Sequence, residues 1–171
     1  MTLRNLSLLF ISLFILAACG GGGGGSTTPP TAGCSPSTTN LCITVVGGKY
    51  VVQNSSSAGV SQKTLTLNAG TYTFDQTDSS NVTSGGAYGS ARIHQIGFST
   101  TTDGTHGGGS AYSTGVNTSG SPGSNGKTTI VIDASTPSTL YYYCVNHTGM
   151  GGTINIVIGN QSDQVEFTET N

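Results

Sequence analysis

Hydrophobic and polar residues alternate along several short segments of the chain. The alternation is clearest at Leu65/Leu67, Tyr72/Phe74, Ile130/Ile132 and Ile154/Ile156/Ile158. Alternation gives a strand one buried face and one solvated face, as in antiparallel sheets. On this basis we predict strands at residues 42–46, 49–53, 63–67, 71–76, 91–99, 127–133, 139–144 and 152–159.

Turn-forming residues separate these strands, as in "NAG" at 68–70 and "STPS" at 135–138. Seven or eight short strands within about 120 residues predict an all-β fold, a two-sheet Greek-key β-sandwich. Two longer segments, 77–90 and 101–126, lack the alternation. Loops of that length are usually functional or pack over one end of a sandwich.

The composition and motifs argue against two classes of function, nucleic-acid binding and catalysis. Charged residues make up 7% of the 171 residues, and the formal net charge is −2. A chain without a basic surface is not expected to bind nucleic acid. The sequence contains no nucleophile elbow, phosphate loop or paired catalytic carboxylates, so we expect no enzymatic activity. We also expect the protein to be monomeric.

The N-terminal segment has the layout of an export signal. Arg4 is followed by an apolar stretch at 6–18, which is short for a bilayer span, and then by Cys19. The ending "LAAC" resembles the lipobox of bacterial lipoproteins, which implies a signal peptide at 1–18 and a lipid on Cys19. Gly20 is not an inner-membrane retention signal, so the resemblance implies a periplasmic or cell-surface protein anchored to the outer membrane. A plain secretory signal is the alternative.

The rest of the chain divides into three parts. Residues 19–40 carry the lipidated cysteine and a Gly/Ser/Thr/Pro-rich segment that predicts a flexible tether. Residues 41–160 hold all the predicted strands and form the expected domain. Residues 161–171 form an acidic tail that is expected to fray.

The chain has four cysteines, and one of them lacks an obvious partner. Cys34 and Cys42 bracket a short polar loop and are expected to form a disulfide in an oxidising compartment. With Cys19 assigned to lipid, Cys144 is left over. An odd cysteine in an exported protein is buried and inert, cross-linked to another chain, or bound to a metal.

Cys144, His147 and Met150 follow the spacing C-x2-H-x2-M at the end of a predicted strand. One short loop therefore offers a thiolate, an imidazole and a thioether, which are ligands of a trigonal His2Cys copper site with a weak axial Met. A second histidine is still required. His94 and His106 are the candidates, and we favour His94 because a strand holds a ligand more rigidly than the glycine-rich loop around His106 does.

Several of these segments resemble the cupredoxins, the plastocyanin-like blue copper proteins. The resemblance lies in "LYYYC" with "VNHTGMGG" (140–152), in "HQIGF" (94–98) and in "LTLNAGTYTF" (65–74). It implies one mononuclear copper ion, electron transfer and a transient redox partner protein. It also implies equatorial metal ligands at His94, Cys144 and His147 and an axial ligand at Met150.

The chain departs from the cupredoxin pattern at a few points. Gln95 stands where Asn often follows the upstream histidine, and the interval between His147 and Met150 is short. A dinuclear copper loop would need a second cysteine, which this loop does not have. The long segment 101–126 also resembles parts of cupredoxin-like modules whose function is poorly defined.

Two other functions fit parts of the sequence. Each residue of the motif also has a role that needs no metal. Cys144 could be a buried core thiol, His147 could form a hydrogen bond in a turn, and Met150 could fill a gap in the packing. The chain would then be a non-metal surface module, such as an adhesin, with binding loops rich in Ser, Thr and Gly. A copper-delivery lipoprotein is the other alternative, although such proteins tend to carry more Met and His.

Overall fold

The computed structural model describes residues 33–83 and 92–159 of the chain. This part consists of short strands and two 3-10 helices, η1 and η2. The elements are β1 (Asn40–Val46), β2 (Lys49–Asn54), β3 (Ser57–Ser61), β4 (Leu65–Asn68), β5 (Gly70–Asp75), η1 (Ser79–Asn81), β6 (Val82–Thr83), β7 (Arg92–Ile93), β8 (Ile96–Ser99), η2 (Gly104–Gly107), β9 (Val116–Ser119), β10 (Lys127–Ile132), β11 (Thr139–Cys144) and β12 (Gly152–Val157).

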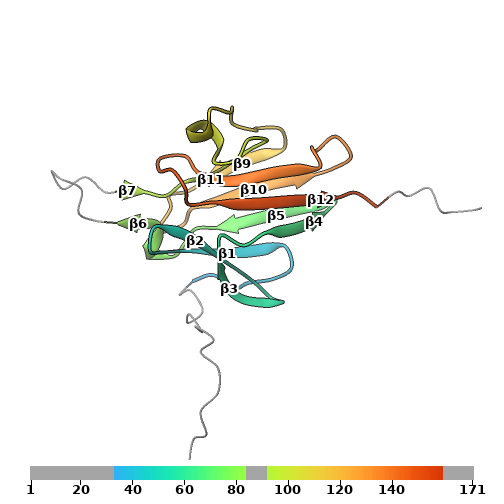
Figure 1. The fold of residues 1–171 in the computed structure, drawn as a ribbon. Coiled ribbons are helices and arrows are strands. Elements are labelled where there is room, and N and C mark those ends of the chain that lie inside the picture. Colours follow the sequence, from blue (N-terminus) through green and yellow to red (C-terminus); the bar gives the residue numbers. More distant parts are fainter. Residues whose placement is uncertain (1–32, 84–91, 160–171) are drawn as a thin grey trace, which may run out of the picture.

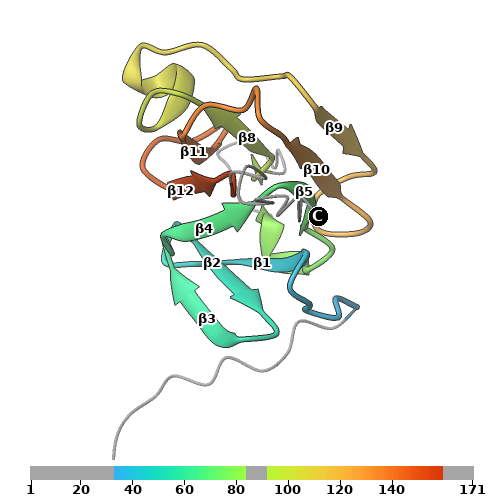
Figure 2. The same ribbon diagram turned by 90° about the vertical axis from the view of Figure 1, so that its right-hand side faces the viewer.

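The strands form two main sheets that pack against each other (Figures 1 and 2). The larger sheet has the order β3-β2-β1-β5-β10-β9, and the smaller has the order β4-β12-β11-β8. Most neighbouring strands are antiparallel, while β1–β5 and β12–β4 are parallel. A separate ribbon pairs β6 with β7. The predicted all-β, two-sheet sandwich is therefore confirmed, whereas its Greek-key connectivity stays a prediction.

The core lies between the two sheets and explains the alternation in the sequence. In β10, for example, Thr128, Ile130 and Ile132 are buried while the residues between them are more exposed. The ring of Phe74 on β5 meets Phe98 on β8 edge to face, with centroids 5.1 Å apart. Contacts of this kind join the two sheets, and burial of apolar surface is the main force that stabilises them.

The structure corrects some of the predicted strands. The predicted strand at 91–99 is interrupted, because β7 ends at Ile93 and β8 begins at Ile96. His94 thus lies in a break between two strands and not within one. The structure also adds the strands β3 and β9, which the alternation does not predict because their residues are mostly exposed.

Cys34 and Cys42 form the expected disulfide, with their Cα atoms 5.9 Å apart. Cys144 is a free cysteine and is fully buried. The predicted signal peptide, Cys19 and the acidic tail lie outside the described residues. Within residues 33–83 and 92–159, no helix has the length and apolar character needed to cross a membrane.

We predict that Phe74→Ala destabilises the protein by about 3–5 kcal/mol, because it removes a ring that is fully buried between the sheets. The free energy of unfolding, measured by urea denaturation, checks this. The control is Val131→Ala on β10, where the side chain is 44% exposed and the loss should stay below about 1 kcal/mol. Equal losses in the two variants would contradict the assigned core.

Candidate metal centre

Three side chains converge at one end of the sandwich: His94, Cys144 and His147. Their potential ligand atoms all lie within 4.8 Å of one another. The Sγ atom of Cys144 is 3.5 Å from Nδ1 of His147 and 3.9 Å from Nδ1 of His94. His94 and Cys144 are buried, whereas His147 is partly exposed. This cluster could hold a metal ion.

The pairing of β11 with β8 brings Cys144 and His94 together. Cys144, the last residue of β11, lies opposite Ile96, the first residue of β8. One further ladder-like bond, from the Val145 N–H to the Gln95 carbonyl at 2.9 Å, continues the pairing past the end of both strands. The antiparallel register therefore places His94 beside the start of the loop that follows Cys144.

His94 is held by side chains at the point where its backbone leaves the sheet. Its carbonyl oxygen accepts hydrogen bonds from the Tyr50 hydroxyl, at 2.8 Å, and from the Gln76 side-chain amide. Its own N–H donates to the carbonyl of Asn81 at 2.9 Å. These bonds replace the ladder bonds that are missing at the break between β7 and β8. Both the N–H and the carbonyl of His94 therefore keep a hydrogen-bond partner.

Gln76 and Asn81 form a buried polar network beneath His94. Both side chains are fully buried. The Gln76 amide donates to Asn81 Oδ1 at 3.1 Å, and its carbonyl oxygen accepts from the Ile96 N–H at 3.0 Å. Asn81 in turn donates to the Ile43 carbonyl at 2.8 Å. Neither residue is predicted as functional from the sequence, because Gln76 only ends a predicted strand and Asn81 lies in the irregular segment 77–90.

The ligand loop, residues 145–151, has its backbone groups bound by surrounding residues. Lys49 and Gln62 donate to the carbonyl of Gly149, and Gln62 also donates to that of Gly151. The N–H of Tyr50 donates to the Met150 carbonyl at 2.9 Å. A Cβ atom at Gly151 would lie 1.7 Å from the Tyr142 carbonyl oxygen, so only glycine fits there. The loop is therefore closely packed against the sandwich.

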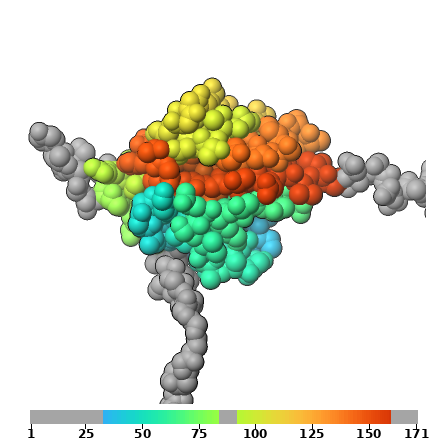
Figure 3. All heavy atoms as spheres, viewed as in Figure 1, coloured from blue at the N-terminus to red at the C-terminus, as the bar shows by residue number. Residues whose placement is uncertain are grey.

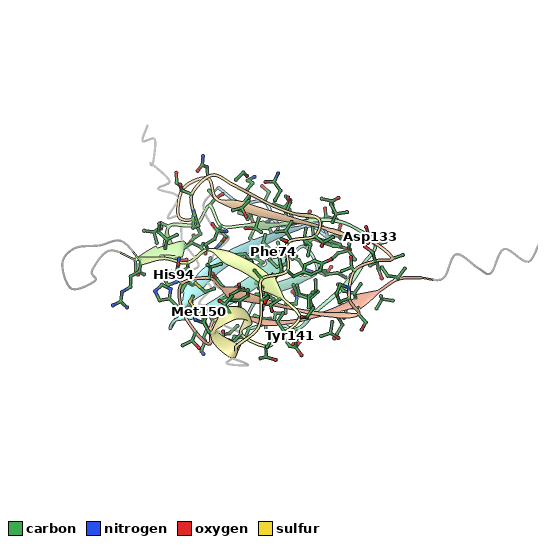
Figure 4. All side chains as sticks on the ribbon, turned by 90° about the horizontal axis from the view of Figure 1, so that it is seen from above. Phe74, His94, Asp133, Tyr141 and Met150 are labelled. Carbon is green, nitrogen blue, oxygen red and sulfur yellow. A yellow bond between two sulfur atoms is a disulfide. The ribbon has the colours of Figure 1, made fainter. Side chains whose placement is uncertain are left out.

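Met150 is buried within the hydrophobic core, with only 2% of its surface exposed. It lies at the same end of the molecule as His94 and opposite the end that carries Asp133 (Figure 4). The position suits both a core residue and a weak axial ligand, so the axial role of Met150 stays a prediction.

His106 takes a different place from His94. It lies on η2, and its Nε2 atom is 3.0 Å from the backbone carbonyl of Cys144. A carbonyl can only accept, so Nε2 of His106 carries the proton. Of the two candidate histidines, His94 alone belongs to the donor cluster, while His106 touches the main chain of the cysteine.

Electrostatics favour a neutral imidazole at His94. Burial lowers the pKa of His94 below its ordinary value, and the nearby charges of His147 and Arg92 lower it further. The rings of His94 and His147 are 4.6 Å apart, so two imidazolium ions would repel each other there. Burial also raises the pKa of Tyr50, which keeps its hydroxyl protonated as a donor to the His94 carbonyl.

The spacing of the donors fits a metal ion. With metal–sulfur and metal–nitrogen bonds of about 2.3 Å and about 2.0 Å, as for zinc, a trigonal plane separates sulfur from each nitrogen by about 3.7 Å. The two observed separations, 3.5 and 3.9 Å, lie on either side of this value. The sulfur–nitrogen separations therefore fit one ion. The two imidazole nitrogens, which lie within 4.8 Å of each other, would stand about 3.5 Å apart in the same trigonal plane.

A scan against protein-family models finds no match, and a search of curated proteins finds none either. The interpretation of the site therefore depends on its own residues.

We predict that Gln76→Leu lowers the free energy of unfolding of the metal-free protein by about 2–6 kcal/mol. The substitution leaves the buried Ile96 N–H and Asn81 Oδ1 without a partner, and each unsatisfied buried group costs about 1–3 kcal/mol. Urea denaturation measures the loss. Gln53→Leu on β2, where the side chain is partly exposed, serves as the control, and a Gln76→Leu protein as stable as that control would contradict the network.

Proposed function

We propose that the protein binds one copper ion through His94, Cys144 and His147 and carries electrons outside the cytoplasm. The observation that supports this most strongly is the convergence of one thiol and two imidazoles within 4.8 Å. His94 comes from the break between β7 and β8, and Cys144 and His147 come from the end of β11 and the loop after it. When bound, copper supplies a one-electron Cu(I)/Cu(II) couple. The protein would accept one electron from a reduced partner protein and pass it to an oxidised one.

The donor set favours copper over zinc. Structural zinc sites close with four strong ligands, whereas this cluster has three, and the fourth candidate is the weak thioether of Met150. A His2Cys set with a weak axial Met is characteristic of blue copper centres. We propose Met150 as that axial ligand, in line with its burial beside the loop.

The residues around the cluster would fix the donors and exclude water. Cys144 is fully buried, and the His94 carbonyl is bound by Tyr50 and Gln76. Rigid donors change position little when charge changes, which keeps the energetic cost of electron transfer low. The burial of the thiol also limits hydration of the site, which is one of the factors that set a reduction potential.

His147 is the donor that we propose as the electron port, because it is the only partly exposed member of the cluster. Ile93 precedes His94 in the chain, Val145 lies two residues before His147, and their side chains are 42% and 44% exposed. Asn146 ties this region together by donating to the Ile93 carbonyl at 2.8 Å. Exposed apolar side chains near a donor suit the brief encounters of redox proteins, whose interfaces are small.

The cellular setting is also part of the proposal. We propose that Cys19 carries a lipid that anchors the protein to the outer membrane, with the segment up to residue 40 as a tether and a monomeric domain in the periplasm or at the cell surface. The Cys34–Cys42 disulfide supports this setting, since disulfides persist in oxidising compartments.

We predict an intense visible thiolate-to-copper band that saturates at one copper per chain when the protein is titrated with Cu(II). Cys144→Ser should abolish the band, because it removes the thiolate. His94→Ala should abolish or strongly shift it, whereas His106→Ala should retain it, because only His94 lies in the donor cluster.

Absorption spectroscopy of the wild type and the three variants measures this. No band in the wild type, together with free alkylation of Cys144 in the presence of copper, would reject the copper site and favour a non-metal surface module. A band that needs His106 but not His94 would reject the ligand assignment.

We predict that Val145→Glu slows electron exchange between the oxidised and reduced copper protein by about tenfold, because like charges then face each other when two copies dock through this surface. Val131→Glu on β10 is the matched control, since its side chain is also 44% exposed. Magnetic resonance line broadening measures the exchange rate. Equal rates in both variants would reject the docking surface, and rapid loss of copper in place of electron exchange would favour a copper-delivery protein.

A further inference from the structure

The segment around η2 rests directly on the outer face of β11. A Cβ atom at Gly104 would lie 2.5 Å from the ring of Tyr143, so the backbone of η2 touches that ring. His106 meets the same ring edge to face, with centroids 6.2 Å apart. Figure 3 shows this yellow segment lying over the orange C-terminal strands. We call residues 101–109 the flap.

The flap bonds to the ligand loop through Asp103. The N–H of Gly149 donates to both carboxylate oxygens of Asp103, at 2.9 and 3.0 Å. The hydroxyl of Thr148 donates to Oδ2 of the same carboxylate. Hydrogen bonds to a carboxylate are stronger than those between neutral groups, so one charged side chain fixes the loop between His147 and Met150.

The second bond of the flap reaches the strand end. His106 donates from Nε2 to the carbonyl of Cys144, the residue that supplies the sulfur. The two flap residues therefore hold the chain on both sides of His147, one at Cys144 and the other at Thr148 and Gly149.

The backbone of the flap is shaped for these contacts. Asp103 has a φ of 58° and thus adopts the left-handed conformation, which is unfavourable for residues with a Cβ atom. Asp is one of the few residues that tolerate this conformation. Its side chain caps no N–H of η2 and instead points to the ligand loop. The carbonyl of Asp103 accepts from the His106 N–H at 3.1 Å and so begins η2, while its carboxylate is left for the contact with the loop.

We propose that Asp103 and His106 are positioning residues that hold Cys144 and His147 in metal-binding geometry before and after the metal binds. This proposal rests on the proposed copper function for the identity of the metal, but not for the contacts themselves. Lys49 and Gln62 hold the opposite side of the loop, so loss of the flap contacts should loosen the loop without unfolding the sandwich.

The test uses Asp103→Gly and His106→Ala, singly and together, in the full chain. Glycine suits the φ of Asp103, so Asp103→Gly removes the carboxylate without straining the backbone. Loss of groups that orient metal ligands typically costs 10–100-fold in affinity, so we expect the double variant to release copper to a chelator at least about tenfold faster. Its charge-transfer spectrum and reduction potential should also shift.

Two further variants separate positioning from a general structural effect. Thr105→Ala lies on the same exposed turn of η2 and should behave as the wild type. Asp103→Asn keeps one oxygen that can accept from Gly149 and should recover part of the wild-type spectrum. A double variant with wild-type release rate, spectrum and potential would overturn the proposal.

A metal-free measurement distinguishes failure of this proposal from failure of the copper function. Amide hydrogen exchange at Gly149 should be at least about tenfold faster in Asp103→Gly than in the wild type, because the N–H loses its acceptor. Faster exchange would support the flap contacts even if the wild type shows no copper band. Unchanged exchange would overturn them even if the copper band is present.

Discussion

The site depends on the register between β11 and β8. Cys144 and His94 are fifty residues apart, and bringing them together costs conformational entropy. The strand pairing from Tyr141↔Ser99 to Cys144↔Ile96 offsets this cost, so a metal ion need not do so. A slip of one residue would turn every side chain of β8 to the other face. The buried Ile96 and Phe98 forbid such a slip, and so the core fixes the place of the donor histidine.

The same end of the sandwich must also bury polar groups. Gln76 and Asn81 are fully buried, and an unpaired buried amide would cost about 1–3 kcal/mol. Within the described residues, no buried side-chain nitrogen or oxygen lacks a hydrogen-bond partner. Their bonds run from the Ile43 carbonyl to the Ile96 N–H, that is, from the larger sheet to the smaller one. The network therefore links the two sheets at the point where His94 leaves the ladder.

Local patterns in the sequence predict the features of this structure that depend on neighbouring residues. Alternation at Ile130 and Ile132 predicts a half-buried strand, and the short spacing from Cys144 predicts a clustered thiol and imidazole, because neighbours in a tight loop stay close. The break at His94 is not predictable in this way, since distant side chains hold it. The burial of Tyr143 on the outer face of β11 has the same origin: the flap that covers it is thirty-four residues or more away in sequence.

Folding of the described residues would not depend on a metal ion bound at the candidate site. In small zinc domains the metal supplies the folding energy, and the metal-free chain is unfolded. In the part of the chain that the structure describes, eighteen buried residues already form one hydrophobic cluster. The ligand loop is bound at Gly149 by Asp103, which accepts from its N–H, and by Gln62, which donates to its carbonyl. Little chain entropy is left for a metal to remove, so its binding energy is available for affinity and for a fixed donor geometry. A rigid loop of this kind restricts access to the site. The partly exposed His147 leaves one donor open to the surroundings, while Cys144 and His94 stay buried.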